Sequence, residues 1–128
     1  MSEILLAVNG TLMKGFALNK NLGAVHAEFI REAQTAAQYR MWSIHDEYPA
    51  MQRDRHGGQQ IDVEIWKLTP EALLKILDNE PPGLCLGRIQ LIEDHWVFGM
   101  LGESYLCEGM PEITEWCGWR NYVAQREK

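Results

Sequence analysis

The chain has 128 residues, of which 46% are hydrophobic and 23% are charged, as expected for one globular domain spanning residues 1–128. Its net charge is −6 at pH 7 and its basic residues are scattered, which argues against the basic patch that nucleic acids and anionic membranes require. No apolar stretch approaches the roughly 20 residues that span a bilayer, so we expect neither a nucleic-acid nor a membrane partner.

The first predicted element is a buried strand over Ile4–Val8, which opens into residues 8–15, here named the glycine loop. The loop holds Gly10 and Gly15, and glycine permits backbone conformations and a close ligand approach that a Cβ would forbid. Successive N–H groups in such a turn can bind an anion, which makes a small carboxylate-bearing molecule the expected ligand. The alternative is a tight turn that binds nothing.

The next segments alternate in type. Helical spacing of apolar residues predicts a helix over Ala24–Ala33, and bulky residues predict a strand over Tyr39–His45. Pro49 is expected to break regular strand pairing, and the polar residues 54–60, with two glycines, to close a hairpin.

A strand over Ile61–Leu68 is predicted by its partial period of two. Asp62 and Glu64 share one face of this strand, which leaves two interpretations. They point into a pocket, or they lie on a solvated outer face, which the ordinary alternation of sheets favours.

A helix is predicted to begin at Pro70, after Thr69 as its N-cap, and to end at Asn79 or Glu80. The helix end and the neighbouring Asp78 are both expected to raise the pKa of Glu80, which suits a general acid or base. The alternative is a solvated carboxylate at a helix end.

The last elements are a hairpin formed by Leu86–Ile92 and His95–Leu101, then a short helix or irregular segment over Ile113–Tyr122. Trp116 and Trp119 are three residues apart, so both can dock on the domain. Together the elements predict a mixed α+β fold.

The sequence offers no sign of secretion or of a bound metal. Its N-terminus carries Glu3 rather than a basic region, so we expect a cytoplasmic protein with reduced thiols. The three cysteines and four histidines lack metal-ligand spacing, and no dinucleotide or phosphate-loop motif is present. We therefore expect no metal and no cofactor.

Three stretches resemble the gamma-glutamylcyclotransferase-like families, which carry a Tyr-Gly-(Ser/Thr)-Leu loop, a Tyr-Pro-Ala-(Leu/Met) segment and a Leu-Asp-x-x-Glu-Gly catalytic segment. The corresponding stretches here are Asn9-Gly10-Thr11-Leu12, Tyr48-Pro49-Ala50-Met51 and Leu77-Asp78-Asn79-Glu80. Asn9 replaces the tyrosine, and Glu80 arrives one residue early. The resemblance implies that Glu80 is catalytic and that the substrate-binding residues are Asn9, Gly10, Thr11, Leu12 and Tyr48.

A longer resemblance is to the C-terminal domain of allophanate hydrolase, which shares that fold. Five stretches carry it in the same order, namely residues 8–19, 35–40, 57–66, 82–87 and 113–122. For example, Thr35-Ala36-Ala37-Gln38-Tyr39-Arg40 is similar to the Thr-Ala-x-x-Tyr-Arg segment of that domain. Leu12 stands where the domain often has histidine, and Glu80 where it usually has an apolar residue. The resemblance implies a small mixed-sheet β-barrel with flanking helices and a pocket bordered by the glycine loop.

This second resemblance also implies a role in urea and allophanate nitrogen metabolism, where the domain is linked to decarboxylating the product of an amidase domain. Because that amidase domain is absent from these 128 residues, a separate amidase subunit is an implied partner.

Two functions follow. The first is an enzyme of hydrolase, lyase or cyclotransferase type, in which the N–H groups of Gly10–Leu12 bind a small carboxylate or carbamate and Glu80 is the acid or base. The second is a non-catalytic module that binds a small ligand or an amidase, with Trp116 or Trp119 as partner contacts.

Overall fold

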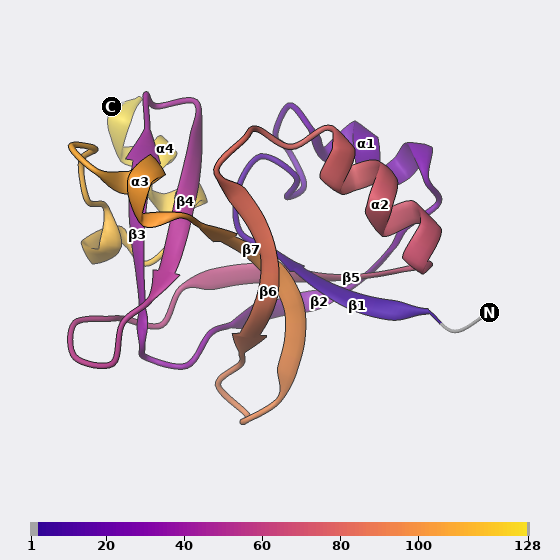
Figure 1. Ribbon diagram of the computed structural model, residues 1–128, viewed down its shortest axis with the longest axis horizontal. Helices are drawn as coiled ribbons and strands as arrows, with labels where there is room; N and C mark the ends of the chain where they lie inside the picture. The colour runs from indigo at the N-terminus through magenta and orange to yellow at the C-terminus, as the bar shows by residue number, and fades with distance from the viewer. Residues whose placement is uncertain (1–2, 128) are drawn as a thin grey trace.

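The computed structural model describes residues 3–127 and contains two sheets with helices around them (Figure 1). The larger sheet has the strand order β2-β5-β1-β7-β6, and the smaller one pairs β3 with β4. In chain order the elements are β1 (Ile4–Val8), α1 (Asn19–Ala24), β2 (Glu28–Gln34), β3 (Tyr39–Ile44), β4 (Tyr48–Arg53), β5 (Asp62–Leu68), α2 (Pro70–Asp78), β6 (Leu84–Gln90), β7 (Trp96–Gly102), α3 (Ser104–Cys107), a 3-10 turn (Thr114–Trp116) and α4 (Trp119–Arg126). The predicted α+β class is confirmed.

The larger sheet is mixed and strongly curled. Its central strand, β1, runs antiparallel to β5 and parallel to β7. The chain just beyond each edge strand, β2 and β6, meets in one bridge between Thr35 and Leu91. This bridge does not continue into a ladder among the described residues, so the predicted small β-barrel is a curled sheet that stays open.

The local signals of the α2 helix are confirmed. The Thr69 hydroxyl accepts a hydrogen bond from the N–H of Ala72 at 3.1 Å, and Pro70 occupies the first turn. The helix ends at Asp78. Figure 1 shows α1 and α2 at one end of the molecule and β3, β4, α3 and α4 at the other.

The helix predicted over Ala24–Ala33 is wrong, because this segment enters the edge strand β2. Phe29 and Ala33 are half-buried, whereas the residues between them are exposed. A register shift between Phe29 and Arg31 interrupts the pairing with β5 and masks the period of two in the sequence. The interrupted strand therefore imitates the spacing of a helix.

Two expectations around β4 are also wrong. Pro49 lies inside the strand, paired with Ser43. The N–H of Ser43 points away from that pair, to the carbonyl of Pro111 at 2.9 Å, so this pair needs no N–H from the proline. Residues 54–60 do not close a hairpin, since the strands that they join belong to different sheets.

The C-terminal segment docks on the domain as predicted. Trp119 is 2% exposed and joins the main core, and Trp116 packs against that core while partly exposed. No helix of residues 3–127 combines the length and apolar character needed to cross a membrane.

Candidate functional site

One cavity of about 240 Å³ lies where the glycine loop, the start of β4 and the chain after α2 meet. It is bordered by every residue that the sequence proposed for the site, namely Asn9, Gly10, Thr11, Leu12, Tyr48 and Glu80. Segments 70 residues apart thus meet in one place, and the roles of these residues stay predictions.

The glycine loop borders the cavity with residues whose N–H groups have no partner among the described residues. The carbonyls of Gly10 and Thr11 accept hydrogen bonds from the N–H groups of Met13 and Leu18, both at 3.0 Å. Among residues 3–127 no hydrogen bond is donated by the N–H of Gly10, Thr11 or Leu12. Glycine is needed at position 10, because a Cβ there would lie 2.5 Å from Cδ of Pro49. Three successive residues that border the cavity therefore have N–H groups without a partner in residues 3–127.

The side chains of Asn9 and Leu12 are less suited to chemistry. The amide of Asn9 donates a hydrogen bond to the carbonyl of Met100 at 3.2 Å and contacts Sδ of Met51 at 3.9 Å. Leu12 is 4% exposed and belongs to the core. Asn9 therefore ties the loop to β4 and β7, and Leu12 contributes an apolar wall.

Two carboxyls border the cavity, that of Glu47, which is exposed, and that of Glu80, which is partly buried. Burial raises the pKa of the Glu80 carboxyl from 4.5 to about 7. The direction agrees with the sequence prediction but the cause does not, because burial, rather than the helix end or Asp78, produces the shift. No hydrogen bond to this carboxyl occurs within residues 3–127, so nothing there stabilises its ionised form against burial.

Tyr48 adds a hydroxyl that stays protonated. Burial, and then the nearby carboxyls of Glu47 and Glu80, raise the pKa of its phenol above the usual value. Among the described residues no Lys, Arg or His borders the cavity, whose remaining walls are mainly apolar. An anionic ligand would therefore depend on backbone donors, the Tyr48 hydroxyl and a protonated Glu80.

The solvated face favoured for Glu64 by the strand alternation is wrong, and both Asp62 and Glu64 border a second cavity, as the other interpretation expected. Glu64 is 2% exposed. Its Oε1 accepts hydrogen bonds from the N–H of Lys14 at 3.0 Å and from Nε1 of Trp66 at 3.1 Å, and its Oε2 from Nη2 of Arg120 at 3.2 Å. One signal was available, because Trp66 lies on the same strand face and such a bulky ring favours burial there.

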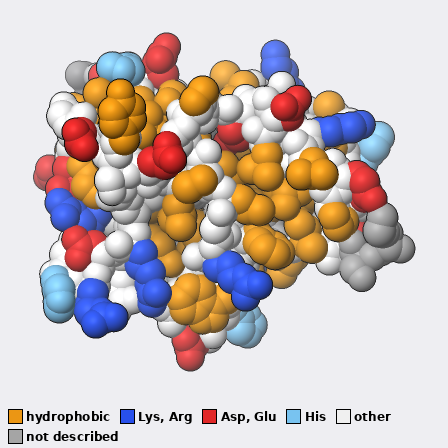
Figure 2. All heavy atoms as spheres, in the orientation of Figure 1, with side chains coloured by type: hydrophobic (Ala, Val, Ile, Leu, Met, Phe, Trp, Pro, Cys, Tyr) orange, Lys and Arg blue, Asp and Glu red, His pale blue; other side chains and the backbone are white. Residues whose placement is uncertain are grey.

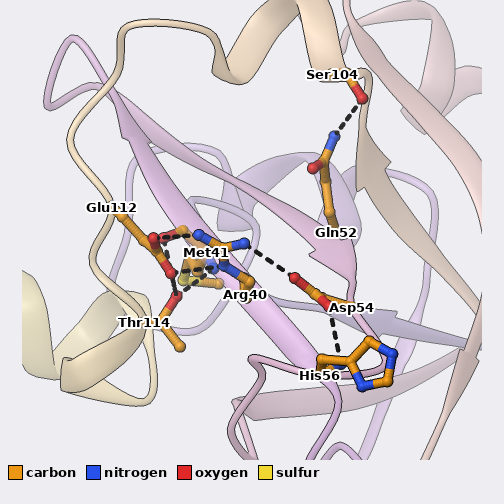
Figure 3. Close-up of polar contacts among 8 residues, drawn as sticks. All are labelled: Arg40, Met41, Gln52, Asp54, His56, Ser104, Glu112 and Thr114. Carbon is orange, nitrogen blue, oxygen red and sulfur yellow. Dashed lines mark hydrogen bonds and ion pairs between the residues drawn. The ribbon is translucent and has the colours of Figure 1, made fainter.

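A second polar network lies around Arg40, outside the cavity (Figure 3). Its guanidinium donates to Glu112 at 2.6 and 2.8 Å and to Asp54 at 2.9 Å. The Thr114 hydroxyl donates to Glu112 at 2.7 Å and accepts from the N–H of Met41 at 3.0 Å. The network fastens β3 to the C-terminal segment, which is a structural role.

Within residues 3–127 no three His, Cys, Asp or Glu side chains gather in a way that could hold a metal ion.

Residues 4–124 match the family model described as allophanate hydrolase C-terminal domain. Among curated proteins, the chain is 25% identical to urea amidolyase of Saccharomyces cerevisiae across 99% of its own length. It spans only 7% of that relative.

Two solved structures show how far the likeness extends. One is c4763, a uropathogenic E. coli-specific protein, which is 47% identical with a TM-score of 0.94 over 97% of this chain and 98% of that one. The other is a mouse AIG2-like protein, which is 16% identical with a TM-score of 0.66 over 89% and 88% of the two chains. The second likeness concerns the fold alone, and it agrees with the gamma-glutamylcyclotransferase-like fold expected from the sequence.

Proposed function

Because this chain belongs to the allophanate hydrolase C-terminal domain family, we propose that it is an enzyme acting on a small carboxylate or carbamate in the cavity. The N–H groups of Gly10–Leu12 hold the anionic group, and Glu80 transfers the proton. One observation carries this proposal: a carboxyl with a pKa raised to about 7 borders the same cavity as three N–H groups without partners in residues 3–127.

The chemistry follows from the protonation of Glu80. A carbamate loses carbon dioxide when its nitrogen gains a proton and the bond from nitrogen to the carboxyl carbon breaks. Protonated Glu80 can supply that proton and recover one from water. In cyclotransferase chemistry, ionised Glu80 would instead accept the proton of the amine that attacks the γ-glutamyl carbonyl. It would then pass this proton to the departing amine as the amide bond breaks. A pKa near the working pH serves both directions.

The wider setting is also part of the proposal. The curated relative is a urea amidolyase, so we propose a place in cytoplasmic urea or allophanate nitrogen metabolism for this chain. The chain covers a small part of that relative, and a separate amidase protein is the partner that this setting suggests.

A second candidate is a non-catalytic module that binds a ligand or a protein partner. It is favoured by Asn9 and Leu12, because the first uses its amide within the fold and the second is apolar. Trp119 is buried and unavailable to a partner. Figure 2 shows hydrophobic side chains across the middle of one face, and the exposed apolar residues include Leu86 and Trp96, at 38% and 47%.

The test combines binding and turnover. Calorimetry measures binding of malonamate, the carbon isostere of allophanate, and assays follow allophanate and a γ-glutamyl amine. Glu80→Gln should lower turnover of the accepted substrate by at least about 100-fold, as expected for loss of a general acid or base. Asp78→Asn is the matched control, because Asp78 is exposed and outside the cavity. Binding without turnover would favour the module, and full activity of Glu80→Gln would refute the mechanism.

A further inference from the structure

We infer that Glu64 and Arg120 are positioning residues for the glycine loop. They hold Lys14 from outside the candidate cavity and thereby fix the N–H groups of Gly10–Leu12. The inference rests on the proposed function, since the placement of those donors matters to activity only if the cavity binds an anion.

Lys14 is held at both polar atoms of its backbone. Its N–H donates to Oε1 of Glu64 at 3.0 Å. Its carbonyl accepts from Nη2 of Arg120 at 2.6 Å, and the same nitrogen donates to Oε2 of Glu64 at 3.2 Å. Three groups from the loop, β5 and α4 therefore close a ring of hydrogen bonds around one peptide segment.

The anchor of this ring cannot move easily. Glu64 lies within β5, where its backbone pairs with Val8 at the start of the glycine loop. Its carboxylate is buried and receives three donors, of which Nε1 of Trp66 is the third. Hydrogen bonds to an ionised group are short and strong, and a buried charge that loses a donor is costly. The carboxylate therefore fixes the position of the Lys14 backbone relative to the sheet.

The loop separates two cavities. Gly10, Thr11 and Leu12 border the candidate cavity, whereas Met13 borders a second one of about 520 Å³ together with Glu64 and Arg120. A turn closed by the N–H of Met13 and the carbonyl of Gly10, at 3.0 Å, links the two sides. Because Leu12 and Met13 are both buried, a displacement of Lys14 is transmitted to the donors rather than absorbed by side chains.

Arginine is the residue type that this geometry requires. One planar guanidinium reaches both the carbonyl of Lys14 and the carboxylate of Glu64. A lysine would present a single ammonium on a flexible stem and would not hold both acceptors in fixed geometry. Arg120→Lys thus keeps the charge and weakens the positioning.

The test compares Arg120→Met with Arg31→Met. Arg31 borders the same second cavity, and its replacement removes the same charge. Among the described residues, however, its guanidinium pairs with exposed Glu93 and makes no hydrogen bond to the glycine loop. We expect Arg120→Met to shift the ¹⁵N–¹H signals of Gly10 and Thr11 and to weaken malonamate binding about tenfold, the effect of losing one charge-assisted hydrogen bond. The pH at which malonamate binding to Arg120→Met is half lost should equal that of the wild type, because Arg120 lies outside the cavity of Glu80. Arg31→Met should change neither signals nor affinity.

Arg120→Lys keeps the experiment decisive if Arg120→Met does not fold, and its loss of affinity should be smaller. Wild-type affinity in a folded Arg120 variant, with unshifted loop signals, would overturn the inference. If the wild type itself does not bind malonamate, the proposed function fails, and the loop signals of the Arg120 variants still decide whether these residues position the loop.

Discussion

Glu80 and Glu64 are both withdrawn from water, yet they border different cavities and have opposite surroundings. Glu80 lies between apolar walls, without a hydrogen bond to its carboxyl in residues 3–127, and burial raises its pKa to about 7. Glu64 receives donors from the loop, from its own strand and from α4. The energetic cost of burying a carboxylate therefore remains uncompensated at Glu80, whereas hydrogen bonds offset it at Glu64.

One residue type therefore serves two purposes in this small domain. A carboxyl without partners keeps a proton available near neutral pH, at the expense of stability once it ionises. A carboxylate with every oxygen engaged orders the chain around it and has little freedom left for chemistry. The glycine loop lies between the two, because its residues 10–12 border the cavity of Glu80 and its Lys14 is held by Glu64.

The largest effect should come from removing Glu64. Glu64→Ala leaves two N–H donors and the Arg120 guanidinium without their acceptor, and we expect the free energy of unfolding to fall by about 3 kcal/mol. Urea denaturation at pH 7 measures this, with Glu93→Ala on the exposed partner of Arg31 as the control. A fall in the free energy of unfolding no larger than that of the control would contradict the claim that the Glu64 carboxylate stabilises the fold.

Glu80 should behave in the opposite way. Its folded-state pKa is raised, so the folded protein holds this proton while the unfolded chain loses it above pH 4.5. Stability is therefore greatest below that pH and falls as pH rises to about 7. The full shift corresponds to about 3 kcal/mol, and partial exposure to water reduces the expected effect to about 2 kcal/mol. Glu80→Gln should be more stable than the wild type by this amount at pH 8.

The measurement for Glu80 is a pair of denaturation curves at pH 5 and pH 8. At pH 5 the folded wild type keeps its proton, so the advantage of the glutamine variant should shrink strongly. If the glutamine variant exceeds the wild type in stability by the same amount at both pH values, the change of side chain, rather than the ionisation of Glu80, causes the difference.

Part of this picture could be predicted from the sequence, because its signals are local. The Thr69-Pro70 helix start and the strand predicted over Ile61–Leu68 depend on neighbours within a few residues. Both elements are confirmed, although the strand begins at Asp62 and is buried on both faces between Val63 and Trp66. The cavity was predicted from family motifs that occur in the same order along this chain. Such a resemblance places distant residues such as Tyr48 and Glu80 in one site, which no local pattern does.

What could not be predicted depends on distant partners. The burial of Glu64 requires Lys14, 50 residues away, and Arg120, 56 residues away, and the local alternation contains neither. The segment Ala24–Ala33 was misassigned because a register shift in an edge strand removes the period of two. The sheet stays open because the chain beyond β2 and β6 pairs in a single bridge rather than in a ladder. Hydrophobic pattern and composition do not encode this difference.

Binding of malonamate should depend on pH through Glu80. An anion in the cavity is compatible with neutral Glu80 and repelled by the ionised form, so malonamate affinity should fall as pH rises through about 7. The steepest expected change is about tenfold per pH unit, or about 1.4 kcal/mol. Calorimetry between pH 5.5 and 8.5 measures it, with Glu80→Gln as a variant whose affinity should stay nearly constant. A malonamate affinity that rises with pH would contradict a role of neutral Glu80 in holding the anion.

The smallest effect should come from an ion pair that shares a cavity with Glu64 but not its burial. Arg31 donates to Glu93 at 2.8 Å, and the two side chains are 43% and 40% exposed. Exposed pairs gain little, because water screens the charges and long side chains lose freedom, so Arg31→Met should change the free energy of unfolding by less than about 0.5 kcal/mol. Denaturation at low and high salt checks this, and the difference should vanish at high salt. A loss as large as that of Glu64→Ala would show that the shared cavity, and not the burial of the carboxylate, determines the energetic weight of its charges.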